Sequence, residues 1–131
     1  MASELSNYLA NEILDWFKGN AIVSAPGTVY VALFNGDPTA TGSGGTEVTT
    51  TIRPAGRVGV TWGSITSRAI SNSAEIDFGA ADAGASVTHA ALFDASSVGN
   101  MLAFTPLDVP RTISGGDAVV IPIGDLAVNF N

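Results

Sequence analysis

The sequence contains no cysteine among its 131 residues, and it has only one histidine, His89. The absence of cysteine excludes disulfides, thiolate nucleophiles and zinc sites with sulfur ligands. A lone histidine likewise excludes a metal site built from several histidines. A chain of this length can bury about two thirds of its unfolded surface in one core. We therefore expect a single domain, residues 1–131, that folds without cross-links or metal ions.

Basic residues are scarce and scattered along the chain. Five Lys and Arg residues stand against twelve Asp and Glu residues, which gives a net charge of −7. Because no cluster of positive charge is present to neutralise phosphates, the composition argues against binding to nucleic acid or to an anionic membrane surface. The N-terminus has no basic region before an apolar run, and no run approaches the ~20 residues of a membrane span. We expect synthesis in a cytoplasm and a soluble product.

Charged residues of either sign make up only 13% of the chain, about half of the ~25% that is usual for soluble domains. Hydrophobic residues make up 46%, and the mean hydropathy is positive. A domain with this composition often hides part of its surface against neighbouring subunits. A compact, alanine-rich β domain without partners is the alternative, and the composition favours the subunit contacts.

An amphipathic helix is predicted over residues 4–18, ELSNYLANEILDWFK, because its apolar residues recur at helical spacing. Ser3 is placed to cap its N-terminus, and Lys18 followed by Gly19 is a typical C-terminal signal. The apolar stripe of this helix consists of Leu5, Leu9, Ile13, Trp16 and Phe17. These five residues are the candidate assembly surface.

The remainder, residues 28–131, is predicted to form short strands separated by turns rich in Gly, Pro, Asn and Asp. The predicted strands are residues 28–35, 57–63, 74–78, 86–93, 100–107, 117–121 and 125–130. This density of short strands favours a mainly β fold, an antiparallel, jelly-roll-like β-sandwich with one N-terminal α-helix. The stretch 39–48 is predicted to be a loop, and because it lacks a GKS or GKT motif it does not indicate a phosphate site.

The strand TVYVALFN, residues 28–35, is apolar on both of its faces. Alternation directs Val31 and Leu33 to one face and Ala32 and Phe34 to the other. A strand of this kind needs cover on each side. We expect the opposite sheet to cover the first face. For the second face, the helix at residues 4–18 is favoured over a neighbouring subunit.

No group of residues in the sequence points to catalysis. His89 lies in an otherwise apolar strand, and a catalytic role would require a nucleophile and an acid that converge on it. A structural histidine, hydrogen-bonded to a neighbour or facing solvent, is the favoured interpretation.

Two clusters supply oxygen atoms of the kind that calcium binds. The first contains Asn35, Asp37 and Thr39, and the second contains Asp77 and Asp82. Neither matches an EF-hand loop, and Asx residues next to Gly or Pro usually shape turns, so turn formation is favoured over metal binding. No cofactor is predicted.

Two aromatic residues, Trp62 and Tyr30, are candidates for stacking on a sugar ring, since both lie on or near predicted strands. For Trp62, an ordinary aromatic at the end of a strand is the favoured interpretation. Trp16 belongs to the helical stripe and is expected in a core or an interface.

The sequence resembles a family of small structural proteins of tailed bacteriophages, described as tail fibre or minor tail proteins. The resemblance covers nearly the whole chain and rests on ELSNYLANEILDWF, TVYVALFNGDPTATGSGGTEV, RVGVTWG, ISNSAEIDFGAADAGASVTHAALFDASSVGNMLAFTPLD and VPRTISGGDAVVIPIGDLAVNF. It implies a non-enzymatic virion component, made in the host cytoplasm, that assembles with other virion proteins. By analogy with fibre components it also implies a homo-oligomer, with a trimer favoured.

Three other functions stay open at this point. A capsid decoration or cement protein is also small, rich in β-structure and often trimeric. A carbohydrate-binding module for recognition of a host surface would use Trp62 and Tyr30. An enzyme is the least favoured of the three, because it requires a cleft that joins His89 to two carboxylates.

Overall fold

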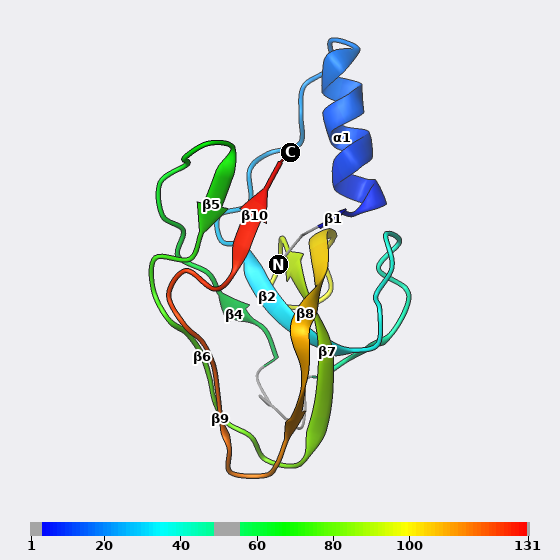
Figure 1. Ribbon diagram of the computed structural model, residues 1–131. Coiled ribbons are helices and arrows are strands. Elements are labelled where there is room, and N and C mark those ends of the chain that lie inside the picture. The colour runs from blue at the N-terminus through cyan, green and yellow to red at the C-terminus, as the bar shows by residue number, and fades with distance from the viewer. Residues whose placement is uncertain (1–3, 49–55, 131) are drawn as a thin grey trace.

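The computed structural model of the chain describes residues 4–48 and 56–130. Over these residues the fold is mainly β, with one α-helix near the N-terminus (Figure 1). The helix is α1 (Asn7–Phe17), and the strands are β1 (Glu4–Leu5), β2 (Tyr30–Asn35), β3 (Thr46–Glu47), β4 (Val58–Gly59), β5 (Ala69–Ser71), β6 (Ile76–Ala80), β7 (Ala85–Phe93), β8 (Met101–Ile113), β9 (Ala118–Ile121) and β10 (Ala127–Asn129).

The strands form one large antiparallel sheet and two small ones. The large sheet has six strands in the order β1-β8-β7-β2-β3, and β4 also pairs with β2. The small antiparallel sheets are β6-β9 and β5-β10. The predicted class, antiparallel and mainly β with an N-terminal helix, is confirmed. The sandwich itself stays a prediction.

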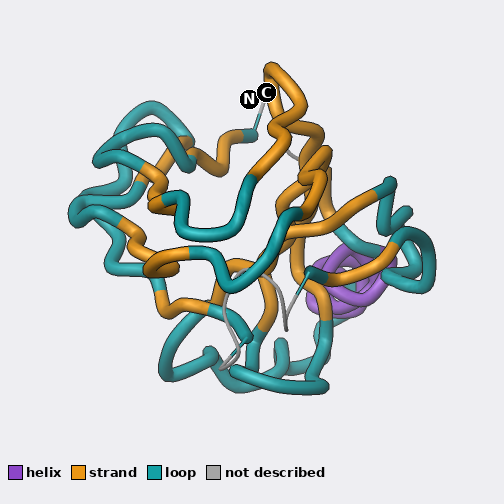
Figure 2. The backbone as a smooth tube through the Cα atoms, turned by 90° about the horizontal axis from the view of Figure 1, so that it is seen from below, coloured by secondary structure: helices purple, strands orange, loops and turns teal. Residues whose placement is uncertain are grey.

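The principal core lies between one face of the large sheet and the small sheets. Val31 and Leu33 of β2 pack there with Ile76 of β6, Val119 of β9 and Leu126. Their side chains are almost completely removed from water. In Figure 2 the strands surround this core and the helix lies to one side of them. Residues of the small sheets therefore pack on the first face of β2.

The hairpin of β7 and β8 contains a large β-bulge. Val87 of β7 pairs with Arg111 of β8, but His89 pairs with Pro106, so four residues of β8, 107–110, lie opposite Thr88 alone. A bulge bends a strand and redirects its side chains. On its other edge, β8 pairs with β1 only at Ala103 and Phe104 in the described part of the chain.

The helix begins later than predicted. Glu4 and Leu5 form β1, paired with β8, instead of the first helical turn. The N-cap is Ser6, whose Oγ accepts a hydrogen bond from the Leu9 N–H at 3.1 Å. Ser3, the predicted cap, lies outside the described residues. The C-terminal signal is confirmed, since Lys18 caps the helix and Gly19 has a φ of 97°.

The helix does not cover the second face of β2. No residue of α1 is buried, and its contacts are with β8 and β1. Figure 1 shows α1 standing at one end of the molecule. The prediction that the helix covers this face is wrong, because pairing of β1 with β8 carries the chain to the end of the sheet before the helix starts.

Loops of the body and a second apolar cluster occupy the second face instead. The cluster consists of Ala32, Phe34, Ala91, Phe93, Met101 and Phe104. The rings of Phe34 and Phe93 stack with centroids 6.3 Å apart and planes 7° apart. Ala40, in the loop after β2, packs against this cluster. The assignment of Ala32 and Phe34 to the second face is confirmed.

Arg57 joins the segments that cover this face. Its Nε and Nη2 donate to the two carboxylate oxygens of Glu47, each at 3.0 Å. Its Nη1 donates to the carbonyl oxygens of Ala95 at 2.9 Å and Val98 at 2.8 Å. The guanidinium carbon lies 3.5 Å from the centroid of the Phe93 ring. Because the side chain is only 6% exposed, these partners replace the water that a buried cation loses.

We predict that Arg57→Lys destabilises the protein by about 2–4 kcal/mol. A single ammonium group cannot reproduce the bidentate pair with Glu47, the two carbonyl contacts and the stacking on Phe93. The free energy of unfolding from urea denaturation measures this loss. The matched control is Arg68→Lys, at an exposed position, for which we expect a change within about 0.5 kcal/mol. Equal effects at the two positions would refute the prediction.

Candidate assembly surfaces

An exposed apolar arm extends from the body of the molecule. The arm is defined here as residues 7–28, which are α1 and the segment after it. Every residue from Trp16 to Thr28 is exposed. The large apolar side chains of the arm and their exposed fractions are Leu14 58%, Trp16 57%, Phe17 72%, Ile22 49% and Val23 46%. These side chains lack cover within the described chain.

The structure separates the five residues of the predicted assembly surface. Leu9 and Ile13 are half-buried on α1, whereas Trp16 and Phe17 lie exposed at its end. The rings of Trp16 and Phe17 are in contact, with centroids 5.5 Å apart. Leu5 is not on the helix but on β1, opposite Ala103. Four of the five residues therefore share the helix.

The arm is stabilised by little burial within its own chain. Isolated helices shorter than ~12–15 residues are marginal in water, and helices in proteins depend mainly on packing of an apolar face. The N-cap at Ser6 supplies only about 1 kcal/mol. Burial of one large apolar side chain supplies roughly 1.5–3 kcal/mol. Because no residue of α1 is buried and several are only half-buried, packing against its own chain supplies only part of this stabilisation.

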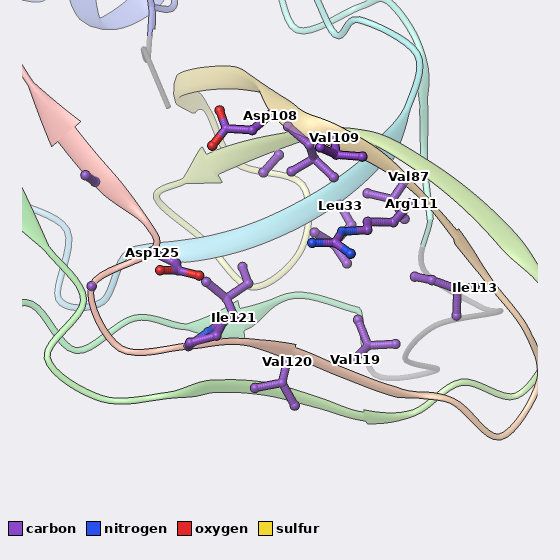
Figure 3. A pocket seen from close by; sticks show the side chains of 15 residues that line it. Leu33, Val87, Asp108, Val109, Arg111, Ile113, Val119, Val120, Ile121 and Asp125 are labelled. Carbon is purple, nitrogen blue, oxygen red and sulfur yellow. The ribbon is translucent and has the colours of Figure 1, made fainter.

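A groove of about 470 Å³ opens between β8 and β9 (Figure 3). Leu33 and Val87 of the core contribute to its lining, and Leu107 and Val109 contribute from the bulge of β8. The apolar residues of β9 line the other side. Three charged residues also line it, namely Asp108, Arg111 and Asp125. The groove therefore combines an apolar lining with a few charges of both signs.

The groove opens between the large sheet and β9. Core-facing residues of the large sheet, Leu33 and Val87 among them, contribute to its lining, and residues 119–121 of β9 line its other side. In the described ranges β9 pairs only with β6. One edge of β9 therefore has no partner strand among the described residues.

A buried amide fixes one wall of the groove. Asn72 is 1% exposed, and its Nδ2 donates to the carbonyl oxygens of Ala74 and Pro122, each at 2.9 Å. Its Oδ1 accepts from the N–H groups of Gly124 at 3.1 Å and Leu126 at 3.0 Å. All four hydrogen-bonding positions of the amide are satisfied. This network holds the turn that precedes β10 and carries Asp125.

A second hollow, of about 380 Å³, lies beneath the first turn of α1. Ser6, Asn7 and Tyr8 line it together with residues 40–42 and 99–101. Partial burial of the Tyr8 hydroxyl raises its pKa above the ordinary value, and the negative charges of Glu12 and Asp94 raise this pKa further. The hollow belongs to the base of the arm, where α1 meets β8.

His89 has the surroundings of a structural residue. It is half-buried on β7, and its Nδ1 lies 2.9 Å from Oγ1 of Thr88. That hydroxyl also accepts a hydrogen bond from the Gly36 N–H at 2.8 Å. In the described ranges no carboxylate is hydrogen-bonded to His89, so the structure does not bring the histidine together with an acid.

The two candidate calcium clusters shape turns. Oδ1 of Asp37 accepts from the Thr39 N–H at 2.8 Å, and Oδ1 of Asp77 accepts from the Gly79 N–H at 2.7 Å. These hydrogen bonds are typical of Asx turns. Within residues 4–48 and 56–130, no group of three or more His, Asp or Glu side chains could hold a metal ion.

The structure does not bring the two candidate sugar-stacking residues together. Trp62 is half-buried and packs against the principal core. Tyr30 belongs, by alternation along β2, to the opposite face with Ala32 and Phe34. The two rings therefore do not form one platform. Among the described residues, no helix has the length and apolar character needed to span a membrane.

The chain matches a known protein family over a range that includes both the arm and the groove. A family model described as podophage GP4 fiber I protein gp80 matches residues 4–129. No curated protein matches the chain. The match agrees with the fibre resemblance found in the sequence and favours it over the capsid decoration alternative.

We predict that Asn72→Ala destabilises the protein by about 3 kcal/mol, because it leaves the N–H of the buried Leu126, the N–H of Gly124 and two carbonyl oxygens without their side-chain partner. Chemical denaturation measures the change. The matched control is Asn129→Ala on β10, where no side-chain hydrogen bond is recorded for Asn129 in the described part of the chain and we expect a change below about 1 kcal/mol. A loss at Asn72 no larger than at Asn129 would contradict the role of the network.

Proposed function

The chain belongs to the Gp80 family of podophage fibre proteins, and we propose that it forms a homotrimer held together by the exposed arm. As a fibre protein it is a structural component of the virion, and it acts by assembly with other virion proteins. The family is not one of enzymes. Within this structural role, we propose that the arm is the surface that makes the contacts between copies.

One observation carries the proposal. The arm exposes Trp16 and Phe17 at 57% and 72%, on a helix that has no buried residue. Large aromatic side chains are the residues that most often dominate protein–protein interfaces. The low charged fraction of the chain, 13%, agrees with a surface that is partly covered in the assembled state.

The energetics favour a closed ring over an isolated pair. The five large apolar side chains of one arm are each 46–72% exposed, so burial of the exposed part supplies on the order of 4–8 kcal/mol. Association costs an estimated 4–15 kcal/mol in lost translational and rotational freedom. The free energy gained from one contact is therefore close to the free-energy cost of one association. Three copies in a ring undergo two associations but make three contacts, so a closed trimer gains where a pair gains little.

We predict that the double variant Trp16→Ser with Phe17→Ser loses the trimer. The wild-type chain should have three times the 13.3 kDa mass of one chain, and the variant should have the mass of one chain. Light scattering after size-exclusion chromatography, over a range of concentrations, measures both masses. Circular dichroism should also show a weaker helical signal in the variant, because α1 loses its cover.

The matched control for this variant is Ile65→Ser, since Ile65 is 79% exposed and lies outside the arm. We expect this control to keep the mass of the wild type. If the wild type is a monomer at every concentration, or if the double variant stays a trimer, the proposed role of the arm is wrong.

A further inference from the structure

We infer that the groove between β8 and β9 receives the arm of a neighbouring copy of this chain. The inference rests on the proposed function and identifies the surface that the arm contacts. It distinguishes two ways of building the oligomer. In one, the arms pack against each other. In the other, which the geometry favours, each arm inserts into the body of the next copy.

The helix α1 lies apart from the groove of its own chain. The base of α1 meets the part of β8 that contains residues 101–104, as shown by the pairing of β1 and by the hollow lined by Ser6 and Met101. The groove lies along the other part of β8, residues 107–113. In Figure 1 the helix stands at the end of the molecule remote from β9. A contact between α1 and the groove is therefore a contact between copies.

The apolar surfaces of the arm and the groove suit each other. Among the apolar residues that line the groove, Leu33 and Val87 are only 6% and 1% exposed, whereas Val120 is 36% exposed. Val109, at the bulge of β8, is 61% exposed. The aromatic pair Trp16 and Phe17 supplies large, rigid side chains that can fill such a recess. Insertion removes both surfaces from water.

Charges near the two surfaces are complementary. Asp15 and Lys18 flank the aromatic pair on the arm, and Lys18 is the only lysine in the chain. The groove carries Arg111, Asp108 and Asp125. Each surface therefore offers charges of both signs, and a seated arm can pair Asp15 with Arg111 and Lys18 with an acid of the groove. Within the arm, the Lys18 and Asp15 pair is long, 3.8 Å, and exposed, so exchanging it for contacts with the groove costs little.

Backbone groups support the same fit. One edge of β9 has no partner strand in the described ranges, and open edges invite pairing with another chain. The segment after α1, residues 20–25, carries Ile22 and Val23 and has no regular secondary structure. It can add to this edge as an extended strand once the helix end is seated.

An arm that inserts into a different surface of its neighbour makes a head-to-tail contact. Such contacts close into a ring when the rotation between copies is a simple fraction of a turn. In a ring of three, every groove is then occupied by an arm and every arm is buried in a groove. This arrangement accounts for both exposed surfaces with one type of contact.

Paired cysteines test the inference, and the absence of native cysteine makes the test clean. The double variant Lys18→Cys with Asp125→Cys should form disulfides between copies under mild oxidation, because its thiols meet when the arm is seated. A non-reducing gel should show a ladder that ends at three times the mass of one chain. The matched control, Lys18→Cys with Asp82→Cys, carries the second thiol on an exposed turn outside the groove and should give no ladder.

The single variant Lys18→Cys separates the two modes of assembly. If the wild type is a trimer but Lys18→Cys alone gives the cross-linked species, the arms pack on each other, and the groove is not their receptor. If the wild type is a trimer and the groove pair gives no ladder, the inference is likewise overturned while the proposed function stands. A wild-type monomer overturns both.

A second variant tests the groove without cross-linking. Val109→Arg places a bulky charge at the groove and should weaken association at least tenfold, measured as the concentration at which half of the trimer has dissociated. Ile65→Arg, at an exposed apolar position outside the groove, is the matched control and should leave association unchanged. Association of Val109→Arg at wild-type strength would count decisively against insertion into the groove.

Discussion

Burial of β2 on both faces is the constraint on which the rest of the fold depends. Val31 and Leu33 require one cover, and Ala32 and Phe34 require another. The small sheets supply the first. Loops joined by the Arg57 network supply the second, while α1 contacts β8 and β1. The end of the helix is therefore left exposed, and the proposed assembly surface follows from how the core is closed.

The sequence predicted what depends on local periodicity and missed what depends on distant pairing. Alternation along β2 assigned its faces correctly, because a period of two is a property of the strand itself. Leu5 was placed in the helical stripe because it fits the spacing, but pairing with Ala103, far along the chain, overrides that preference. The Arg57 network also joins residues that are distant in sequence, so no local pattern predicts it. The sequence predicts a strand that ends at residue 107, whereas in the structure β8 continues to Ile113 through a bulge that contains Pro110.

The groove could not be predicted for a related reason. It exists because β8 continues past its bulge, beyond the end of its pairing with β1, and because Asn72 fixes a turn about fifty positions away in the chain. Each element looks ordinary in the sequence, and only their juxtaposition makes a recess. The family, by contrast, was identifiable from the sequence, since the combination of segments along the whole chain is more specific than any single motif.

The exposed segment after α1 also bears on the lifetime of the subunit before assembly. Residues 19–28 have the exposure and the lack of regular structure that proteases require. In the proposed trimer an assembled copy covers this segment, whereas a copy that fails to find its neighbours presents it to proteases. The arm that joins subunits in this proposal would thereby mark the unassembled ones for removal, so that degradation would compete with assembly for each new chain.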